Sequence, residues 1–287
     1  MSWNNSEHVV STDWLAAHLG DPAIALLDGS WHLPAENRDA MAEFLTGHIP
    51  GAQFFDINAI ADPSTGLPHM MPTDEVFAAA MAQMGIGNDT QVVVYDTKGL
   101  FSAPRVWWTF RLMGAKRVSI LDGGMTRWKA EGRQLEAGTA KARPGAKFTV
   151  QRDGSLIRNI ADIRGLIGSE STQLVDARPA GRFSGEQPEP RPGLTQGHIP
   201  GARNLPFNAV TTADGTLKSE AELRTLMAAA GIDPAMPVAA SCGSGVTAAV
   251  TALALTLLGN TQTSIYDGSW AEWGKDKSNP VETGPAR

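Results

Sequence analysis

Cys242 is the residue of this chain best suited to act as a nucleophile, and it is the single cysteine among 287 residues. A short β-rich run at 237–241 precedes it, and an apolar, alanine-rich stretch at 246–255 predicts a helix after it. In open α/β sheets, ligands bind outside the carboxyl ends of the strands, which is where this cysteine would lie. Its position therefore predicts a reactive thiol between a strand and a helix.

The loop that begins with Cys242 is rich in glycine. Glycine permits the tight turn through which several backbone N–H groups point at one place, and the amino end of the helix adds partial positive charge. We expect a cradle made by the loop amides of Gly243, Gly245, Val246 and Thr247. Such a cradle stabilises a thiolate or the outer sulfur of a persulfide, whereas a merely buried cysteine does not need one.

Three other glycine-containing loops do not fit this sequence. A phosphate-binding P-loop requires a lysine, and none follows Cys242 in the loop. A cysteine phosphatase would need an arginine six residues after the nucleophile to grip phosphate oxygens, and that residue is Ala248. A nucleophile elbow centred on Ser244 would need glycine where Cys242 stands.

The chain repeats itself. The hexapeptide Gly-His-Ile-Pro-Gly-Ala occurs at 47–52 and again at 197–202, and the segments around each copy run in parallel. We therefore predict two copies of one domain, at 1–136 and 151–287, joined by a Gly/Pro-rich linker at 137–150. The histidine of each hexapeptide, His48 or His198, is predicted to tie the turn to its own domain, because both copies carry it and only one carries the cysteine.

Short β-rich runs alternate with helical patterns in each copy. The apolar runs predict buried strands at 23–28, 91–96 and 117–121, and the apolar spacing predicts helices at 73–84 and 102–113. This alternation predicts an α/β fold, in which each domain is a small parallel sheet with helices on both faces.

The first copy differs from the second at the decisive position. Asp96 stands there in place of Cys242, and an aspartate cannot carry a transferable sulfur. We therefore expect the N-terminal domain to be inactive and the C-terminal domain to be catalytic.

Composition excludes several classes of function. The apolar fraction of 42% is too high for a disordered chain, and a net charge of −6 lacks the basic field that nucleic-acid binding requires. The longest apolar stretch, 246–258, is shorter than the roughly 20 residues that span a membrane. No Cys/His cluster has metal-ligand spacing and the N-terminus shows no secretory signal, so we expect a cytoplasmic protein without metal or cofactor. We also expect a monomer, because two domains can bury surface against each other.

From about residue 8 to 274 the chain resembles the two-domain rhodanese family. The resemblance is carried by the repeated hexapeptide, by the loop cysteine of the second copy, and by the matching motifs Asp122-Gly123-Gly124 and Asp267-Gly268-Ser269-Trp270. Within that family the cysteine loop is similar to the 3-mercaptopyruvate sulfurtransferases. Thiosulfate sulfurtransferases typically have Arg and Lys where Gly243 and Ser244 stand, and two cations would suit that dianion better than a monocarboxylate.

The resemblance implies two tandem rhodanese-like domains and a two-step sulfur transfer. Cys242 would take sulfur from 3-mercaptopyruvate as a persulfide, release pyruvate, and pass the sulfur to a thiol such as thioredoxin or glutathione, or to cyanide. Arg182 and Arg191 would bind the keto acid. A thiosulfate sulfurtransferase and a non-catalytic persulfide carrier remain as alternatives.

The resemblance also assigns catalytic roles to Ser244 and His69. Ser244 would donate a hydrogen bond or a proton to the ketone oxygen of the departing pyruvate, and His69 would support Ser244. The carboxylate that completes this relay in the family is replaced by Asn58, so the relay is incomplete in this chain.

Overall fold

The chain forms two compact units, which the computed structural model describes for residues 3 and 7–286. Residues 1–2 and 4–6, which contribute to the prediction that no secretory signal is present, lie outside the described residues. The predicted linker is not the only point at which the chain passes from one unit to the other, because each unit includes a short segment from the other half of the sequence. The first unit takes in Thr211–Leu217, and the second takes in Pro63–Met70.

The first unit is built on a five-stranded parallel sheet in the order β1-β5-β4-β2-β3. The three predicted strands are confirmed within one residue at each end. The strands are β1 (Val9–Val10), β2 (Ile24–Asp28), β3 (Gln53–Phe54), β4 (Gln91–Tyr95) and β5 (Val118–Leu121).

The second unit has the same topology, in the order β6-β10-β9-β7-β8, and all of its strand pairs are parallel. Its strands are β6 (Ile157–Arg158), β7 (Gln173–Asp176), β8 (Arg203–Asn204), β9 (Val238–Ser241) and β10 (Thr263–Tyr266). The identical strand order confirms that the sequence repeat is a structural repeat.

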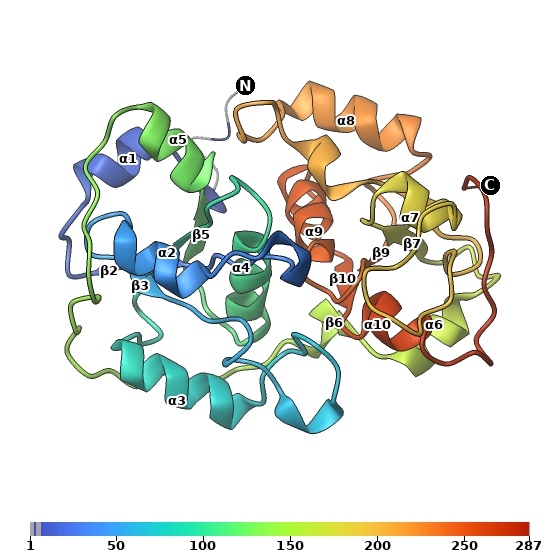
Figure 1. Cartoon of the computed structure of the whole chain (residues 1–287), viewed down its shortest axis with the longest axis horizontal. Helices are drawn as coiled ribbons and strands as arrows, with labels where there is room; N and C mark the ends of the chain where they lie inside the picture. The colour runs from blue at the N-terminus through green and yellow to red at the C-terminus, as the bar shows by residue number, and fades with distance from the viewer. Residues whose placement is uncertain (1–2, 4–6, 287) are drawn as a thin grey trace. The chain divides into compact units, whose positions relative to one another are not determined.

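Helices cover both faces of the first sheet, as predicted (Figure 1). On one face, Phe44 and Trp128 from α2 and α5 pack in a core cluster with alternate strand residues such as Val93. On the other face, α4 packs on β4 and β5, and the rings of Phe77 and Phe110 join α3 to α4. The helices are α1 (Thr12–Ala17), α2 (Ala40–Thr46), α3 (Asp74–Met84), α4 (Ala103–Leu112) and α5 (Gly124–Ala130), with short 3-10 turns η2 (Pro34–Glu36) and, in the second unit, η3 (Pro63–Thr65).

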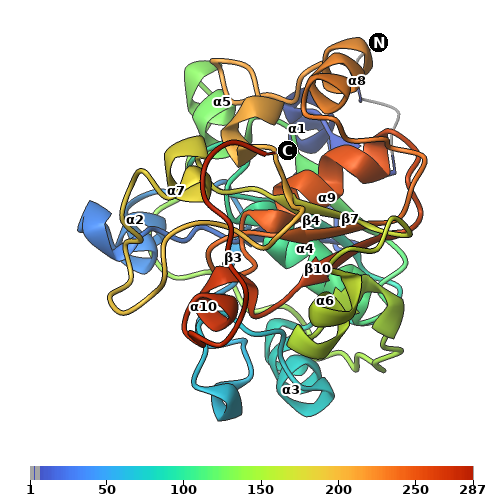
Figure 2. The same cartoon turned by 90° about the vertical axis from the view of Figure 1, so that its right-hand side faces the viewer.

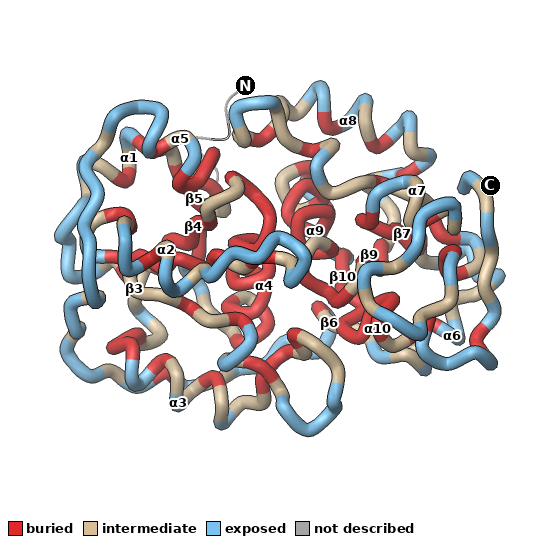
Figure 3. Tube along the Cα trace, viewed as in Figure 1, coloured by how far each residue is buried: buried red, intermediate tan, exposed pale blue. Residues whose placement is uncertain are grey.

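The second sheet is covered in the same way, with α9 on one side of the strands and α6 and α10 on the other (Figure 2). The central strand β9 and the helix α9 are buried almost throughout (Figure 3), which explains why their sequences are nearly continuous apolar runs. The helices are α6 (Ile160–Leu166), α7 (Ala180–Ser184), α8 (Glu220–Ala229), α9 (Ala248–Leu257) and α10 (Ser269–Trp273), with 3-10 turns η4 (Gly154–Leu156) and η5 (Phe207–Val210).

The helix predicted at 246–255 is shifted by two residues at each end, since α9 spans Ala248–Leu257. The apolar stretch that begins at residue 246 suggested a helix from that point, but α9 begins at Ala248. Val246 and Thr247 belong to the loop, where they turn the chain from the cysteine into the helix.

The hexapeptide histidines are held within their own units, which confirms their predicted structural role. The Nδ1 atom of His48 lies 2.8 Å from the carbonyl oxygen of Phe44, and that of His198 lies 2.9 Å from the carbonyl oxygen of Phe183. Each imidazole also stacks on the phenylalanine that it contacts. Both histidines are therefore committed to local packing.

Asp28 and Asp176 occupy equivalent buried places, at the carboxyl ends of β2 and β7, but among the residues that the structure describes only Asp176 has an arginine partner. Burial raises the pKa of Asp28 to about 6, even though hydrogen bonds from Ser30 and Tyr95 act in the opposite direction. The folded state therefore binds the Asp28 proton more tightly than the unfolded chain does, whose value is near 3.8.

Asp28→Asn should make the stability of the protein less dependent on pH. With Asp28 present, its contribution is complete below pH 3.8 and is lost as the pH rises through about 6, a loss of up to about 3 kcal/mol. Urea unfolding at pH 4 and pH 7 measures this difference, with the exposed Asp89→Asn as control. Equal pH dependence in the Asp28→Asn variant and the unmodified protein would contradict the assignment.

No helix in the part of the chain that the structure describes is long and apolar enough to cross a bilayer. Within the same residues, no group of three or more His, Cys, Asp or Glu side chains is placed to hold a metal ion.

Candidate functional site

Cys242 directly follows β9, a central strand of the second sheet that lies between β7 and β10. Because all strands of this sheet are parallel, Cys242 lies at the edge where their carboxyl ends meet, as predicted. Only 2% of its surface is exposed. A sulfur donor must therefore be small enough to reach a thiol at the base of its loop.

The cysteine loop is fixed to the start of α10 through its backbone. The N–H of Trp270 donates to the carbonyl oxygen of Cys242, and the N–H of Ala271 donates to that of Gly243, both at 2.9 Å. The N–H of Cys242 donates to the hydroxyl of Ser269 at 3.1 Å. These bonds leave the loop little freedom, so the place of the thiol is set before any substrate arrives.

Ser269 adopts a backbone conformation that normally favours glycine. Its φ is 50°, and the equivalent residue of the first unit, Gly124, has φ 51°. A serine in this left-handed region is strained, but its hydroxyl supports the Cys242 N–H, an interaction that a glycine could not make.

The two predicted substrate arginines converge on this loop. A Cβ atom built on Gly243 would lie 3.0 Å from Nη2 of Arg182 and 3.8 Å from Nη1 of Arg191. Burial lowers the pKa of Arg191, and repulsion from Arg182 adds to the effect, while attraction to Cys242 opposes it. The structure thus brings the thiol together with two cations that precede it by at least 51 residues in the sequence.

Arg182 is anchored by a buried carboxylate. Glu189 accepts from Nη2 of Arg182 at 2.5 Å and from Nε at 3.3 Å, and its side chain is only 3% exposed. Glu189 also accepts from Nη1 of Arg178 at 2.7 Å. Arg178 in turn binds both carboxylate oxygens of Asp176 and lies over the ring of Trp270, 4.2 Å from its centroid. Four alternating charges therefore run from the end of β7 to the cysteine loop.

The equivalent loop of the first unit is an anion cradle that is already filled. The carboxylate of Asp96 accepts hydrogen bonds of 2.8–2.9 Å from the backbone N–H groups of Lys98, Phe101, Ser102 and Ala103. The N–H of Met125 donates to the Asp96 carbonyl oxygen, just as that of Trp270 does to Cys242. This strand-to-helix loop thus binds a negative group in the copy that lacks the cysteine.

His69 belongs to the unit that carries Cys242 and Ser244, although it lies in the first half of the sequence. His69 and Ser244 are both buried, and His69 has a φ of 58°, in the left-handed region. The predicted relay carboxylate position, Asn58, is exposed. Nearby, Asp56 accepts from the N–H groups of Asn58 and Ala59 and so caps a local turn.

Sequence reasoning missed Arg178, Glu189 and Ser269. Arg178 could have been noticed, because it stands where the first copy has Ser30, two residues after the buried aspartate. Ser269 had a similar signal, since it replaces the second glycine of the Asp-Gly-Gly motif. Glu189 had none, because nothing in the sequence separates it from the other acidic residues.

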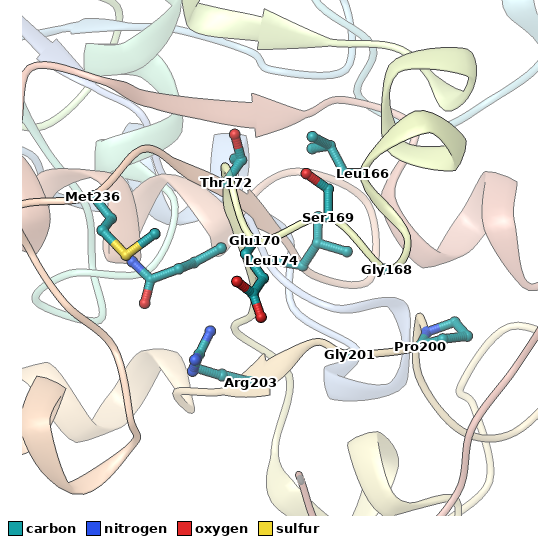
Figure 4. A pocket seen from close by; sticks show the side chains of 11 residues that line it. Leu166, Gly168, Ser169, Glu170, Thr172, Leu174, Pro200, Gly201, Arg203 and Met236 are labelled. Atoms are coloured by element: carbon teal, nitrogen blue, oxygen red, sulfur yellow. The ribbon is translucent and has the colours of Figure 1, made fainter.

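A separate pocket of about 570 Å³ lies at the opposite edge of the second sheet (Figure 4). Leu174 and Arg203, at the amino ends of β7 and β8, line it together with Glu170. Since Cys242 follows the carboxyl end of its strand, this pocket is not part of the thiol site.

Comparisons with known proteins agree with this arrangement. A model of the rhodanese-like domain matches residues 11–131 and 159–276, which confirms the predicted pair of domains. The 3-mercaptopyruvate sulfurtransferase of Escherichia coli (strain K12) is 43% identical over 274 residues, covering 95% of this chain and 97% of that protein. An Arabidopsis thaliana protein named thiosulfate/3-mercaptopyruvate sulfurtransferase 1, mitochondrial, is 40% identical over 302 residues, covering 98% and 80%. The crystal structure of SseA from Escherichia coli matches with a TM-score of 0.83 and 42% identity, covering 92% and 99%.

Proposed function

This chain belongs to the rhodanese family, and we propose that it is an enzyme that transfers sulfur from 3-mercaptopyruvate through a persulfide on Cys242. The observation that carries the proposal is the convergence of Arg182 and Arg191 on Gly243, next to the thiol. Two guanidinium groups at this place suit a small carboxylate with an adjacent ketone.

The first step forms one bond and breaks another. The Cys242 thiolate attacks the sulfur of the donor, the S–S bond of a persulfide forms, and the C–S bond breaks with its electrons passing to pyruvate enolate. The enolate then takes up a proton and leaves as pyruvate. Ser244 donates a hydrogen bond to the ketone oxygen as it becomes the enolate oxygen, and His69 supports Ser244.

The loop amides of Gly243, Gly245, Val246 and Thr247 would stabilise the thiolate and the persulfide. The Asp96 cradle of the first unit supports this role, because the matching loop holds a carboxylate with four backbone N–H groups. Asp96 also supports an inactive domain at 1–136 and a catalytic one at 151–287.

In the second step the outer sulfur passes to an acceptor. We propose a thiol such as thioredoxin or glutathione, with cyanide as an alternative, and a cytoplasmic monomer as the working form. Thiol acceptors are plentiful in a reducing compartment. A chain with one cysteine cannot form an internal disulfide, so its fold does not require an oxidising compartment.

Thiosulfate is the alternative donor, because the Arabidopsis relative carries both donors in its name. The neutral loop favours the keto acid: an arginine at position 243 would enter the space where Arg182 already lies, 3.0 Å from a Cβ. Steady-state rates with the two donors test the proposal, and a preference for thiosulfate would overturn it. A persulfide that loads without release of pyruvate from 3-mercaptopyruvate would instead indicate a carrier.

Arg182→Ala and Arg191→Ala should each raise the KM for 3-mercaptopyruvate about tenfold, with a smaller change in kcat. The reason is that each removes a charge-assisted contact that is present when the donor binds as well as during its reaction. Initial rates of pyruvate release measure the effect, with Arg224→Ala on the exposed face of α8 as control. An arginine whose alanine variant keeps the original kinetics does not belong to the site.

A further inference from the structure

We propose that Glu189 is a positioning residue that holds Arg182 against the cysteine loop, and that Arg178 holds Glu189 in place. This inference rests on the proposed function, since it assigns to Glu189 the task of presenting one substrate-binding arginine. No predicted role covered Glu189, whose carboxylate binds Arg178 and Arg182.

The geometry of Arg182 points to this role. Glu189 binds one edge of the guanidinium, through Nε and Nη2, so the plane and direction of the group are fixed. Nη1 is left on the other edge, and among the described residues it makes no hydrogen bond or ion pair. A long flexible arginine is thereby fixed in one orientation before the donor binds, which lowers the entropic cost of binding.

The burial of Glu189 requires the second arginine. A carboxylate that is 3% exposed needs strong partners, and Glu189 has two of them, Arg178 and Arg182. Burial acts to lower the pKa of Arg178, but Asp176 and Glu189 outweigh it and raise that pKa. Arg178 is itself 1% exposed and bound to Asp176, so it is a fixed support rather than a mobile surface group.

The side chains that hold Arg182 are also connected to the cysteine loop through Trp270. The guanidinium of Arg178 stacks on the ring of Trp270, and the backbone N–H of the same tryptophan donates to the carbonyl oxygen of Cys242. Trp270 therefore contacts both the arginine that holds Glu189 and the backbone of the cysteine loop.

The first unit shows that this charged ladder, formed by Asp176, Arg178, Glu189 and Arg182, is not needed for the fold. Its buried Asp28 has Ser30 two residues later, where the second unit has Arg178. The same sheet, with the same strand order, forms there without the arginine. The charged ladder is therefore an addition in the unit that carries the thiol.

The test is a double-mutant cycle with Glu189→Gln and Arg182→Ala, read as pyruvate release from 3-mercaptopyruvate. Glu189→Gln keeps the shape but removes the charge, so we expect a KM about fivefold to tenfold higher and a kcat within about twofold. In the Arg182→Ala background the same change should alter KM by less than about twofold, because the direct contact of Glu189 with a substrate-binding arginine is then gone and only its electrostatic effect on Arg191 is left. Glu186→Gln, an exposed glutamate of the same loop, is the matched control.

Independent, multiplying effects of the two substitutions on KM would overturn the inference, as would wild-type KM in Glu189→Gln. If Glu189→Gln does not fold, Glu189→Asp replaces it, because aspartate keeps the charge but has a shorter side chain. The effects of Glu189→Asp and Arg182→Ala on KM must then be non-additive in the same way. If the unmodified protein releases no pyruvate, the proposed function fails first. If it does and the cycle is additive, only the role of Glu189 fails.

Discussion

Cys242→Ser should abolish sulfur transfer while leaving the fold intact. The hydroxyl is nearly the same size as the thiol, so the packing between β9 and α9 is kept. Serine has no sulfur atom, however, and therefore cannot form a persulfide. We expect pyruvate release to fall by at least about 10³-fold, as is usual when an enzyme loses its nucleophile. The thermal unfolding midpoint should change by only a few degrees.

Mass spectrometry of the intact protein gives a second measurement that does not depend on turnover. After incubation with 3-mercaptopyruvate, the unmodified protein should carry one extra sulfur atom, and Cys242→Ser should carry none. Cys242→Ala should match the serine variant in both assays, because neither has a thiol. An extra sulfur on either variant would show that another group accepts it, and the role given to Cys242 would be wrong.

The sequence predicts most of the fold because the relevant signals are local. Apolar runs such as 91–96 and the helical pattern at 73–84 match β4 and α3 within one residue. Thr73 illustrates the physical reason, since its side chain accepts from the N–H of Val76 and so starts the helix one residue later. The repeated hexapeptide then predicts that the second half forms the same sheet.

The candidate site is less readable from the sequence because its residues meet through tertiary packing. Cys242 has a local signal, namely a glycine-rich loop between strand and helix, but Arg182 and Arg191 were singled out only by resemblance to a family. Glu189 has no signal in the sequence at all, and the role that we propose for it rests on two ion pairs inside the second unit. The placement of His69 in that unit likewise depends on how the chain packs, not on its neighbours in sequence.

The filled cradle of the first unit leads to a prediction about stability. Asp96 is 1% exposed, and its carboxylate receives four backbone N–H donors at the start of α4. In Asp96→Ala the buried N–H groups of Phe101, Ser102 and Ala103 lose their acceptor, as does the half-buried N–H of Lys98, and each unsatisfied buried donor is costly. We expect the free energy of unfolding to fall by about 3 to 5 kcal/mol in urea titrations.

Two further variants distinguish the loss of the Asp96 hydrogen bonds from the general effect of a substitution on stability. Asp89→Ala removes an exposed aspartate of the same unit and should change the stability by less than about 0.5 kcal/mol. Asp96→Asn keeps one acceptor oxygen but loses the charge, so it should fall between the alanine variant and the unmodified protein. If Asp96→Ala is as stable as Asp89→Ala, the amides do not need an anion. The first unit would then no longer support the view that the matching loop around Cys242 is built to hold a negatively charged sulfur.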